Sequence, residues 1–305
     1  MKQMVRNSLA ELLGIWYTIN GKIKKAKQRA LAGEFILSIY FHAPSAALFE
    51  SCVRWLLKNG FQIIPTQQLL AIKAGEIPFP KGAAIITVDD GWRTNINNIV
   101  AITKQYKVPV TIFATTEPVE KGGAYWWTYA NKAKQLHLIE YSVEQLKKLD
   151  NIERLNIVNK IKATLNLLRE AMYPEELQAI AESKYITVGS HTVTHPILIQ
   201  CDDAEAEFEI CTSKKILELL LNKPITQFAY PNGDYSSREL ELLQLAGYQL
   251  AFTTKTHYLT EDVLKQQLEL PRFEVWESGG YFETISRITG VWFNSKTKKN
   301  HSNGQ

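Results

Sequence analysis

The sequence predicts an α/β protein in which parallel strands and helices form a (β/α) barrel. Apolar, β-branched runs of strand length recur about seven times over some 260 residues, and stretches with helical periodicity lie between them. Strand and helix in alternation indicate parallel strands joined by right-handed crossovers. A closed or nearly closed barrel fits this length better than two separate domains.

The predicted elements follow one another along the chain. The strand-like runs are residues 35–41, 83–88, 108–114, 185–189, 225–230, 248–254 and 268–275. Between them, helical periodicity is clearest in residues 48–57, 96–106, 204–221 and 237–245. These runs place the barrel domain at residues 34–293.

Residues 124–183 interrupt the alternation. This stretch is charged and helical in pattern and has no strand-like run before residue 183. We interpret it as a helical insertion that caps one end of the barrel.

The two ends of the chain differ from the barrel. Residues 1–33 predict a helical extension with an apolar face, formed by Val5, Leu9, Leu12, Leu13, Trp16 and Ile19. A basic cluster follows, formed by Lys22, Lys24, Lys25, Lys27 and Arg29. The apolar face suits packing against the domain, which we prefer, or a peripheral contact with a membrane. Residues 294–305 are polar and predicted to be disordered.

Composition limits the class of protein. The chain is 45% hydrophobic and 22% charged, with a dispersed net charge of +4 that does not argue for a nucleic-acid partner. Its three cysteines, Cys52, Cys201 and Cys211, lack metal-site spacing and indicate a reducing compartment. No run is apolar enough to span a bilayer, and the opening lacks a clear signal-peptide core with a cleavage site. A cytoplasmic location, with membrane association as a variant of it, is the expectation.

The first chemical motif is the pair Asp89 and Asp90, which ends the strand 83–88. Reactive groups of parallel α/β folds lie at the carboxyl ends of strands, and neighbouring side chains there point in different directions. The two carboxylates can therefore serve different roles. A helix cap beside a solvated acid explains the pair equally well when it is considered alone.

The second motif is the pair His191 and His195, which follows the strand 185–189. A spacing of four residues allows one tight loop to present both imidazoles on one side. Two imidazoles and a carboxylate from another strand end are a donor set for Zn²⁺ or a similar ion.

The third motif is "FAYPNGD", where Pro231 and Gly233 predict an irregular turn that can direct the N–H of Asn232 into the barrel mouth.

The sequences "TVDDGW", "SHTVTHP" and "FAYPNGD", in this order, resemble the first three motifs of the polysaccharide deacetylases of the NodB type, carbohydrate esterase family 4. The resemblance covers roughly residues 34–293 and implies a distorted seven-stranded barrel with a helical insertion.

The resemblance implies a role for each matching residue. Asp90, His191 and His195 would bind the metal, and Asp89 would be the general base. We expect the metal to be Zn²⁺, with Co²⁺, Ni²⁺ or Mn²⁺ as alternatives that such ligands also accept. Substrate and oxyanion contacts are expected from Asn232, Tyr230 and Trp92.

Two residues of the family pattern are missing here. Ala229 stands where an arginine usually pairs with the base, and Arg272, at the end of the last strand, is our candidate to orient Asp89 instead. The usual late histidine that acts as general acid is also absent before the tail residue His301. His42, at the end of the first strand, is our substitute, and His257 is the rival.

The resemblance implies removal of N-acetyl groups from an amino sugar in a polysaccharide or in a lipid-linked or nucleotide-linked precursor. Aromatic rings near the mouth suit sugar rings, namely Trp92, Tyr125, Trp126, Trp127 and Tyr235. The alternatives are an amide hydrolase acting on a small non-sugar substrate and a non-catalytic carbohydrate-binding barrel.

Overall fold

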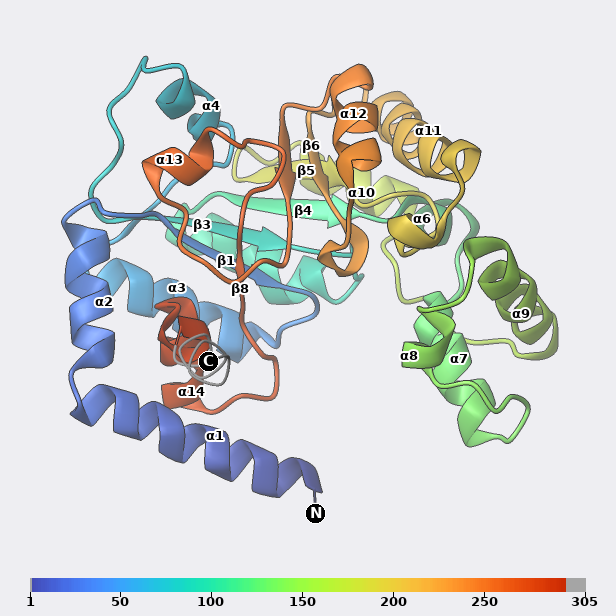
Figure 1. The fold of residues 1–305 in the computed structure, drawn as a ribbon, viewed down its shortest axis with the longest axis horizontal. Helices are drawn as coiled ribbons and strands as arrows, with labels where there is room; N and C mark the ends of the chain where they lie inside the picture. The colour runs from blue at the N-terminus through green and yellow to red at the C-terminus, as the bar shows by residue number, and fades with distance from the viewer. Residues whose placement is uncertain (1, 295–305) are drawn as a thin grey trace, which may run out of the picture.

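Seven parallel strands curl around a common core in the computed structural model, which describes residues 2–294 (Figure 1). Along the sheet their order is β7-β6-β5-β4-β3-β1-β8. The strands are β1 (Leu37–Phe41), β3 (Ala83–Val88), β4 (Val110–Ala114), β5 (Ile186–Ser190), β6 (Gln227–Ala229), β7 (Leu250–Phe252) and β8 (Phe273–Glu274). Each overlaps one predicted run, so the predicted α/β barrel with seven parallel strands is confirmed.

The segment around β8 closes the barrel. The Leu270 N–H donates to Ala251 O of β7 at 2.9 Å, and Phe273 then pairs with Ile39 of β1. Most of the strands thus form a half-barrel. The short segment that contains Leu270 and β8 joins its two edges, β7 and β1, through few hydrogen bonds. A further strand beside β3, β2 (Gln62–Ile63), was not predicted because two residues are too few to show a pattern.

Side chains of the strands alternate between the inside and the outside of the barrel. The inner core is formed by residues such as Ile85, Phe113, Ala229, Leu250 and Phe252. Two short helices cover the amino end of the barrel, α4 (Gln68–Lys73) and α13 (Glu261–Leu264), and both contribute leucines to this core. The outer core packs strand residues such as Ile86, Val88, Ile112 and Phe228 against the surrounding helices.

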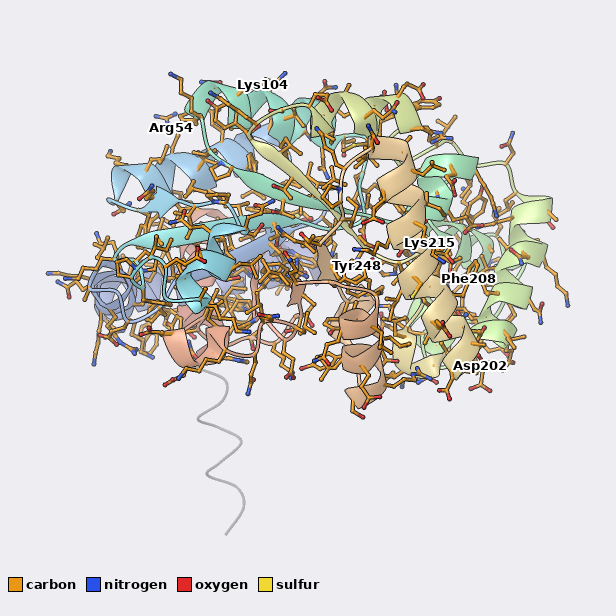
Figure 2. The ribbon with its side chains drawn as sticks, turned by 90° about the horizontal axis from the view of Figure 1, so that it is seen from above. Arg54, Lys104, Asp202, Phe208, Lys215 and Tyr248 are labelled. Carbon is orange, nitrogen blue, oxygen red and sulfur yellow. The ribbon has the colours of Figure 1, made fainter. Side chains whose placement is uncertain are left out.

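The helices predicted between the strands are present. They are α3 (Ala46–Lys58), a π-helical turn η1 (Ile96–Val100) that continues into α5 (Ala101–Tyr106), α11 (Asp203–Leu221) and α12 (Ser237–Leu245). The Asp202 carboxylate caps α11 by accepting from the Glu205 N–H at 2.8 Å. Figure 2 shows α11 running along the outside of the sheet, with Asp202, Phe208 and Lys215 marked along it.

Residues 124–183, the stretch interpreted as an insertion, contain helices and no strand. The helices α7 (Trp126–Gln135), α8 (Val143–Leu146) and α9 (Asn151–Thr164) gather on one side of the sheet, and α6 (Thr116–Lys121) precedes them (Figure 1). The fourth helix of the stretch, α10 (Pro174–Ala181), packs beside β5 and α11 as an ordinary barrel helix.

The chain begins with two helices, α1 (Lys2–Ile19) and α2 (Lys22–Leu31), and α1 packs against α14 (Tyr281–Ile288). Contact is close at Gly14, where a Cβ would lie 2.5 Å from the backbone of Phe282. The buried face of α1 carries Ala10 and Tyr17, while the apolar residues that we expected to pack against the domain remain exposed. The preferred packing hypothesis for that face is therefore wrong.

Within residues 2–294, no helix combines the length and the apolar content needed to cross a bilayer. The tail predicted as disordered, residues 294–305, lies outside the described residues except for Asn294. His301 also lies outside them.

Candidate active site and metal centre

A cavity of about 690 Å³ opens where the carboxyl ends of the parallel strands meet. Most of the predicted site residues line it, namely His42, Asp89, Asp90, Trp92, His191, His195 and Asn232. The insertion forms part of the wall through α7 and α8, which supports its interpretation as a cap over this end of the barrel. Two predicted residues, Arg272 and Tyr230, lie behind the wall and are described below.

Asp90, His191 and His195 form a cluster that could hold a metal ion. The Nε2 atoms of His191 and His195 lie 3.5 and 3.4 Å from Asp90 Oδ1. One possible ligand atom from each residue lies within 4.8 Å of the other two. Burial lowers the pKa of His195 to about 3, with the neighbouring His191 adding to the effect, so its imidazole is neutral at neutral pH, as metal ligation requires.

The backbone at this cluster adopts unusual conformations. Asp90, Thr192 and His195 have φ angles of 73°, 67° and 56°, in the left-handed region that residues other than glycine rarely occupy. Such conformations cost free energy and persist where the surrounding structure enforces them, often at functional sites. The two loops therefore hold the ligand side chains in fixed positions at some local cost.

Two hydrogen-bonding features fit the cluster to a cation. Asp90 Oδ1 is buried and has no hydrogen-bond partner among the described residues. His191 Nδ1 lies 2.7 Å from Ala229 O, and because a carbonyl only accepts, this nitrogen carries the proton. The Nε2 atom of His191 then presents its lone pair to the cluster, as in metal-bound histidines that donate from the other ring nitrogen.

Aromatic residues hold the ligand loops from outside the cluster. Trp92 Nε1 donates to Asp90 Oδ2 at 2.8 Å, and the Tyr125 hydroxyl donates to Asp90 O at 2.9 Å. Trp126 Nε1 donates to His195 O at 3.0 Å. Tyr125 and Trp126 are buried, so these two rings act mainly as supports and not as the open sugar-binding faces that the sequence suggested.

Glu209, on α11, supports the histidine loop from the other side. Its Oε2 accepts from the Val193 and Thr194 N–H groups at 2.8 and 2.9 Å, and its Oε1 accepts from the Thr194 hydroxyl at 2.6 Å. Burial raises the pKa of Glu209, although these hydrogen bonds counteract part of the effect. The carboxylate thus fixes the backbone between the two predicted metal ligands.

Asp89 faces the barrel interior and is held by Arg272. The guanidinium donates twice, from Nη1 to Oδ1 at 2.7 Å and from Nη2 to Oδ2 at 2.8 Å, so the predicted bidentate contact is present. Arg272 also donates to Thr87 Oγ1 and Thr253 O. Burial alone raises the pKa of Asp89, but Arg272 and the nearby histidines outweigh it and leave the pKa below its ordinary value.

His42 lies at the cavity, whereas His257 is exposed and does not line it. The side chain of His42 is 36% exposed, and its Nδ1 lies 3.8 Å from Glu277 Oε1. Burial lowers the pKa of His42, but the surrounding carboxylates, of which Asp90 and Asp89 act most strongly, raise it above the ordinary value. Between the two histidines, only His42 is placed to reach a molecule in the cavity.

Asn232 lies at the rim of the cavity in the short helical turn η3 (Pro231–Gly233), with a φ of 59°. Its side-chain oxygen accepts from Lys147 Nζ at 3.1 Å, which joins the rim to the insertion. Tyr230 points away: its side chain is fully buried and its hydroxyl donates to Leu268 O at 2.9 Å. A substrate contact from this side chain does not fit its position.

The fold and the site together define an α/β-barrel protein with a candidate metal centre at the carboxyl ends of its strands. The chain belongs to the polysaccharide deacetylase family, since the model of that family matches residues 76–251, more than half of the chain. The resemblance inferred from the three motifs is thereby confirmed. Arg272 and His42 lie outside the matched residues, so their placement rests on this structure.

Individual relatives agree with this family. YxkH of Bacillus subtilis (strain 168) is 23% identical over 235 residues, which cover 77% of this chain and 67% of that protein. Among solved structures, IcaB from Ammonifex degensii matches with a TM-score of 0.61 and 16% identity, covering 85% of this chain and 97% of its own. The Streptococcus pyogenes deacetylase PplD, in complex with acetate, matches with a TM-score of 0.57 and 18% identity, covering 80% and 93%. At these identities the two structures support the fold.

Proposed function

We propose that this protein is a metal-dependent hydrolase that removes N-acetyl groups from an amino sugar in a polysaccharide or glycan precursor. The observation that carries the proposal is the arrangement of two buried carboxylates. Asp90 lies with two imidazoles, and the adjacent Asp89 is held by an arginine on the same cavity wall.

The metal would be held by Asp90, His191 and His195, and the unpartnered oxygen of Asp90 supports this assignment. Two nitrogen donors and one oxygen donor suit Zn²⁺, and Co²⁺, Ni²⁺ or Mn²⁺ are the alternatives. When bound, such an ion acts as a Lewis acid that polarises the amide carbonyl and lowers the pKa of water beside it.

Asp89 acts in this proposal as the general base. Its low pKa keeps the carboxylate ionised at neutral pH, and the two bonds from Arg272 fix its orientation. The carboxylate takes the proton from the attacking water. Arg272 is a positioning residue, because it acts through Asp89 and does not line the cavity.

His42 acts as the general acid that protonates the departing amine. The nearby carboxylates of Glu277 and Glu274 favour the protonated imidazole, which suits this role. Asn232, at the rim, is our candidate donor to the oxyanion that forms on the carbonyl, a contribution of ~3 kcal/mol for one donor in comparable sites.

The cavity suits a sugar substrate in size and lining. Trp92 and Trp127 form part of its wall, and its volume lies in the range of ordinary ligand sites. The alternative of a non-catalytic barrel rests on the family arginine missing at Ala229 and on the general acid missing from its usual place. The first reason loses weight because Arg272, directly before β8, contacts Asp89 instead.

Two substitutions separate the proposed roles. Asp89→Asn should abolish acetate release and keep the metal bound, because the base is lost and the ligands stay. His191→Ala should lose both, and His257→Ala, a matched control outside the cavity, should keep both. Metal content is measured after purification with metal present, and wild-type protein that remains metal-free under these conditions contradicts the proposal.

A further inference from the structure

The helix α1 has two opposite faces, and only one of them packs against the rest of the protein. Ala10 and Tyr17 are buried, and Gly14 allows the close approach to α14. The opposite face consists of large apolar side chains that are 49–78% exposed, namely Val5, Leu9, Leu12, Trp16 and Ile19. The apolar character of this face therefore has no explanation in the packing of the described residues.

The exposed residues form one continuous stripe. Their positions advance by four, three, four and three residues, which keeps them on one side of an α-helix. The stripe is about 20 Å long at 1.5 Å per residue. A contiguous apolar surface of this kind on a soluble protein marks a site that contacts a partner or a membrane.

Basic residues adjoin the stripe. Residues 1–33 contain seven lysines and arginines and one acidic residue, so this segment carries more positive charge than the net +4 of the whole chain. Lys22 lies over the ring of Trp16, with Nζ 4.5 Å from the ring centroid, and Lys24 and Lys25 are exposed on α2. The positive charge thus lies at one end of the apolar stripe.

We propose that α1 and α2 form a membrane-docking element that binds the surface of a bilayer containing anionic lipids. The apolar stripe of α1 enters the boundary between headgroups and acyl chains, with Trp16 at the level of the headgroups. Lys22, Lys24 and Lys25 contact lipid phosphates or carboxylates. Charge favours this occupant over a second copy of the chain, because a second copy would bring another basic segment to the same interface.

The docking element also contacts the segment that contributes Glu277 to the cavity wall. Arg6 of α1 lies over the ring of Trp276 at 5.1 Å, and the Glu11 carboxylate accepts from the Phe282 N–H at 3.0 Å. Glu277, the residue that follows Trp276 in the sequence, lines the cavity. The proposed membrane contact is independent of the proposed deacetylase function. Only the idea that the substrate is carried on a lipid would rest on that function.

The test is flotation of the full chain with two kinds of vesicles, phosphatidylcholine alone and phosphatidylcholine with phosphatidylserine. Wild type should bind the vesicles that contain phosphatidylserine and bind less well as salt is raised. A Leu9→Glu/Trp16→Glu variant should bind at least tenfold more weakly. A Lys24→Ala/Lys25→Ala variant should lose about fivefold per lysine on the anionic vesicles.

A matched control is Leu219→Glu/Leu245→Glu, because these leucines are 88% and 85% exposed on α11 and α12, away from α1 (Figure 1). It should bind like the wild type. Unchanged circular dichroism and melting would show that the α1 variants are folded, since the substituted side chains are exposed.

Three results would overturn the proposal. Wild type fails to bind vesicles with phosphatidylserine, or the Leu9→Glu/Trp16→Glu variant binds them as tightly as wild type. The third is a wild-type dimer in analytical ultracentrifugation that the same variant converts to monomers, because a second copy would then cover the stripe. The flotation test does not measure acetate release. The membrane proposal can therefore fail while the proposed deacetylase activity holds, and the reverse.

Discussion

Replacing Arg272 by methionine removes the guanidinium that holds Asp89 and leaves a carboxylate buried inside the barrel. Both side chains are almost inaccessible, at 0% and 4% exposure, and two hydrogen bonds of 2.7 and 2.8 Å join them. Burial by itself raises the pKa of Asp89, and Arg272 is the strongest of the influences that lower it. Without the guanidinium, the pKa of Asp89 should therefore rise above its ordinary value.

The expected loss of stability is about 4 kcal/mol at neutral pH, the usual cost of removing one partner from a buried ion pair. For a chain of this length, that loss lowers Tm by about 6 °C.

The stability difference depends on pH. In the wild type, the lowered pKa of Asp89 stabilises the fold at pH values above the unfolded-state pKa, and this contribution is lost as the pH falls. In the variant, the pKa lies above the unfolded value, so ionised Asp89 is destabilising and acid relieves the cost. The difference between the two proteins should therefore shrink toward acidic pH.

Urea and thermal unfolding at neutral and mildly acidic pH measure this difference. The Asp89→Asn/Arg272→Met double variant is the control, because it removes both charges and should recover most of the stability lost in Arg272→Met. If Arg272→Met is as stable as the wild type at neutral pH, the ion pair with Asp89 does not stabilise the fold. A double variant that is no more stable than Arg272→Met would contradict this role of the ion pair as well.

Three further predictions concern the site. Trp92→Phe removes the N–H at 2.8 Å from Asp90 Oδ2 and should weaken metal affinity about 10–100-fold in calorimetric titration, and unchanged affinity would contradict the supporting role. Glu277→Gln removes a negative charge beside His42, so the pKa of His42 should fall and the alkaline limb of the pH–rate profile should move to lower pH, whereas an unmoved limb would exclude this coupling. His42→Ala should reduce acetate release by about 10²–10⁴-fold and His257→Ala should leave it near wild type, and the opposite result would reverse our choice of general acid.

The positions of the main polar residues followed from the sequence because parallel strands end at a common edge. Asp89, Asp90 and His191 stand directly after or at the end of apolar runs, and the fold brings these runs side by side. The contact of Arg272 with Asp89 was predicted, but the placement of Arg272 at the end of the last strand was wrong. Arg272 directly precedes β8, a strand that pairs with β1, and its long side chain reaches Asp89 from that position.

Other features could not be predicted because they depend on side-chain direction or on distant segments. Tyr230 follows Ala229, and alternation along β6 turns Ala229 toward the inner core and Tyr230 toward the outer core. A one-residue difference thus decides whether a side chain of β6 faces inside or outside. An apolar sequence pattern does not predict which way a side chain points at the end of an irregular strand.

The supports of the ligand loops were missed for a related reason. Trp126 binds the carbonyl of His195 across nearly seventy residues, and Glu209 binds the same loop from the middle of a helix. In the sequence, the tryptophan reads as an aromatic residue near the mouth and the glutamate as one acid in a charged helix. Two features together could have indicated Glu209. It is an acidic residue on the buried face of α11, and the histidine loop has several backbone N–H groups that need an acceptor.

Metal-dependent deacetylation is tested most directly by acetate release from a panel of N-acetylated glycans and glycan precursors, measured with and without a chelator. We expect release from at least one N-acetylated amino sugar, loss of release with the chelator and recovery when a divalent metal is restored. Asp89→Asn should release no acetate under any of these conditions. Release that persists in the metal-depleted protein, or that Asp89→Asn retains, would contradict the assignment of the metal cluster and of the base.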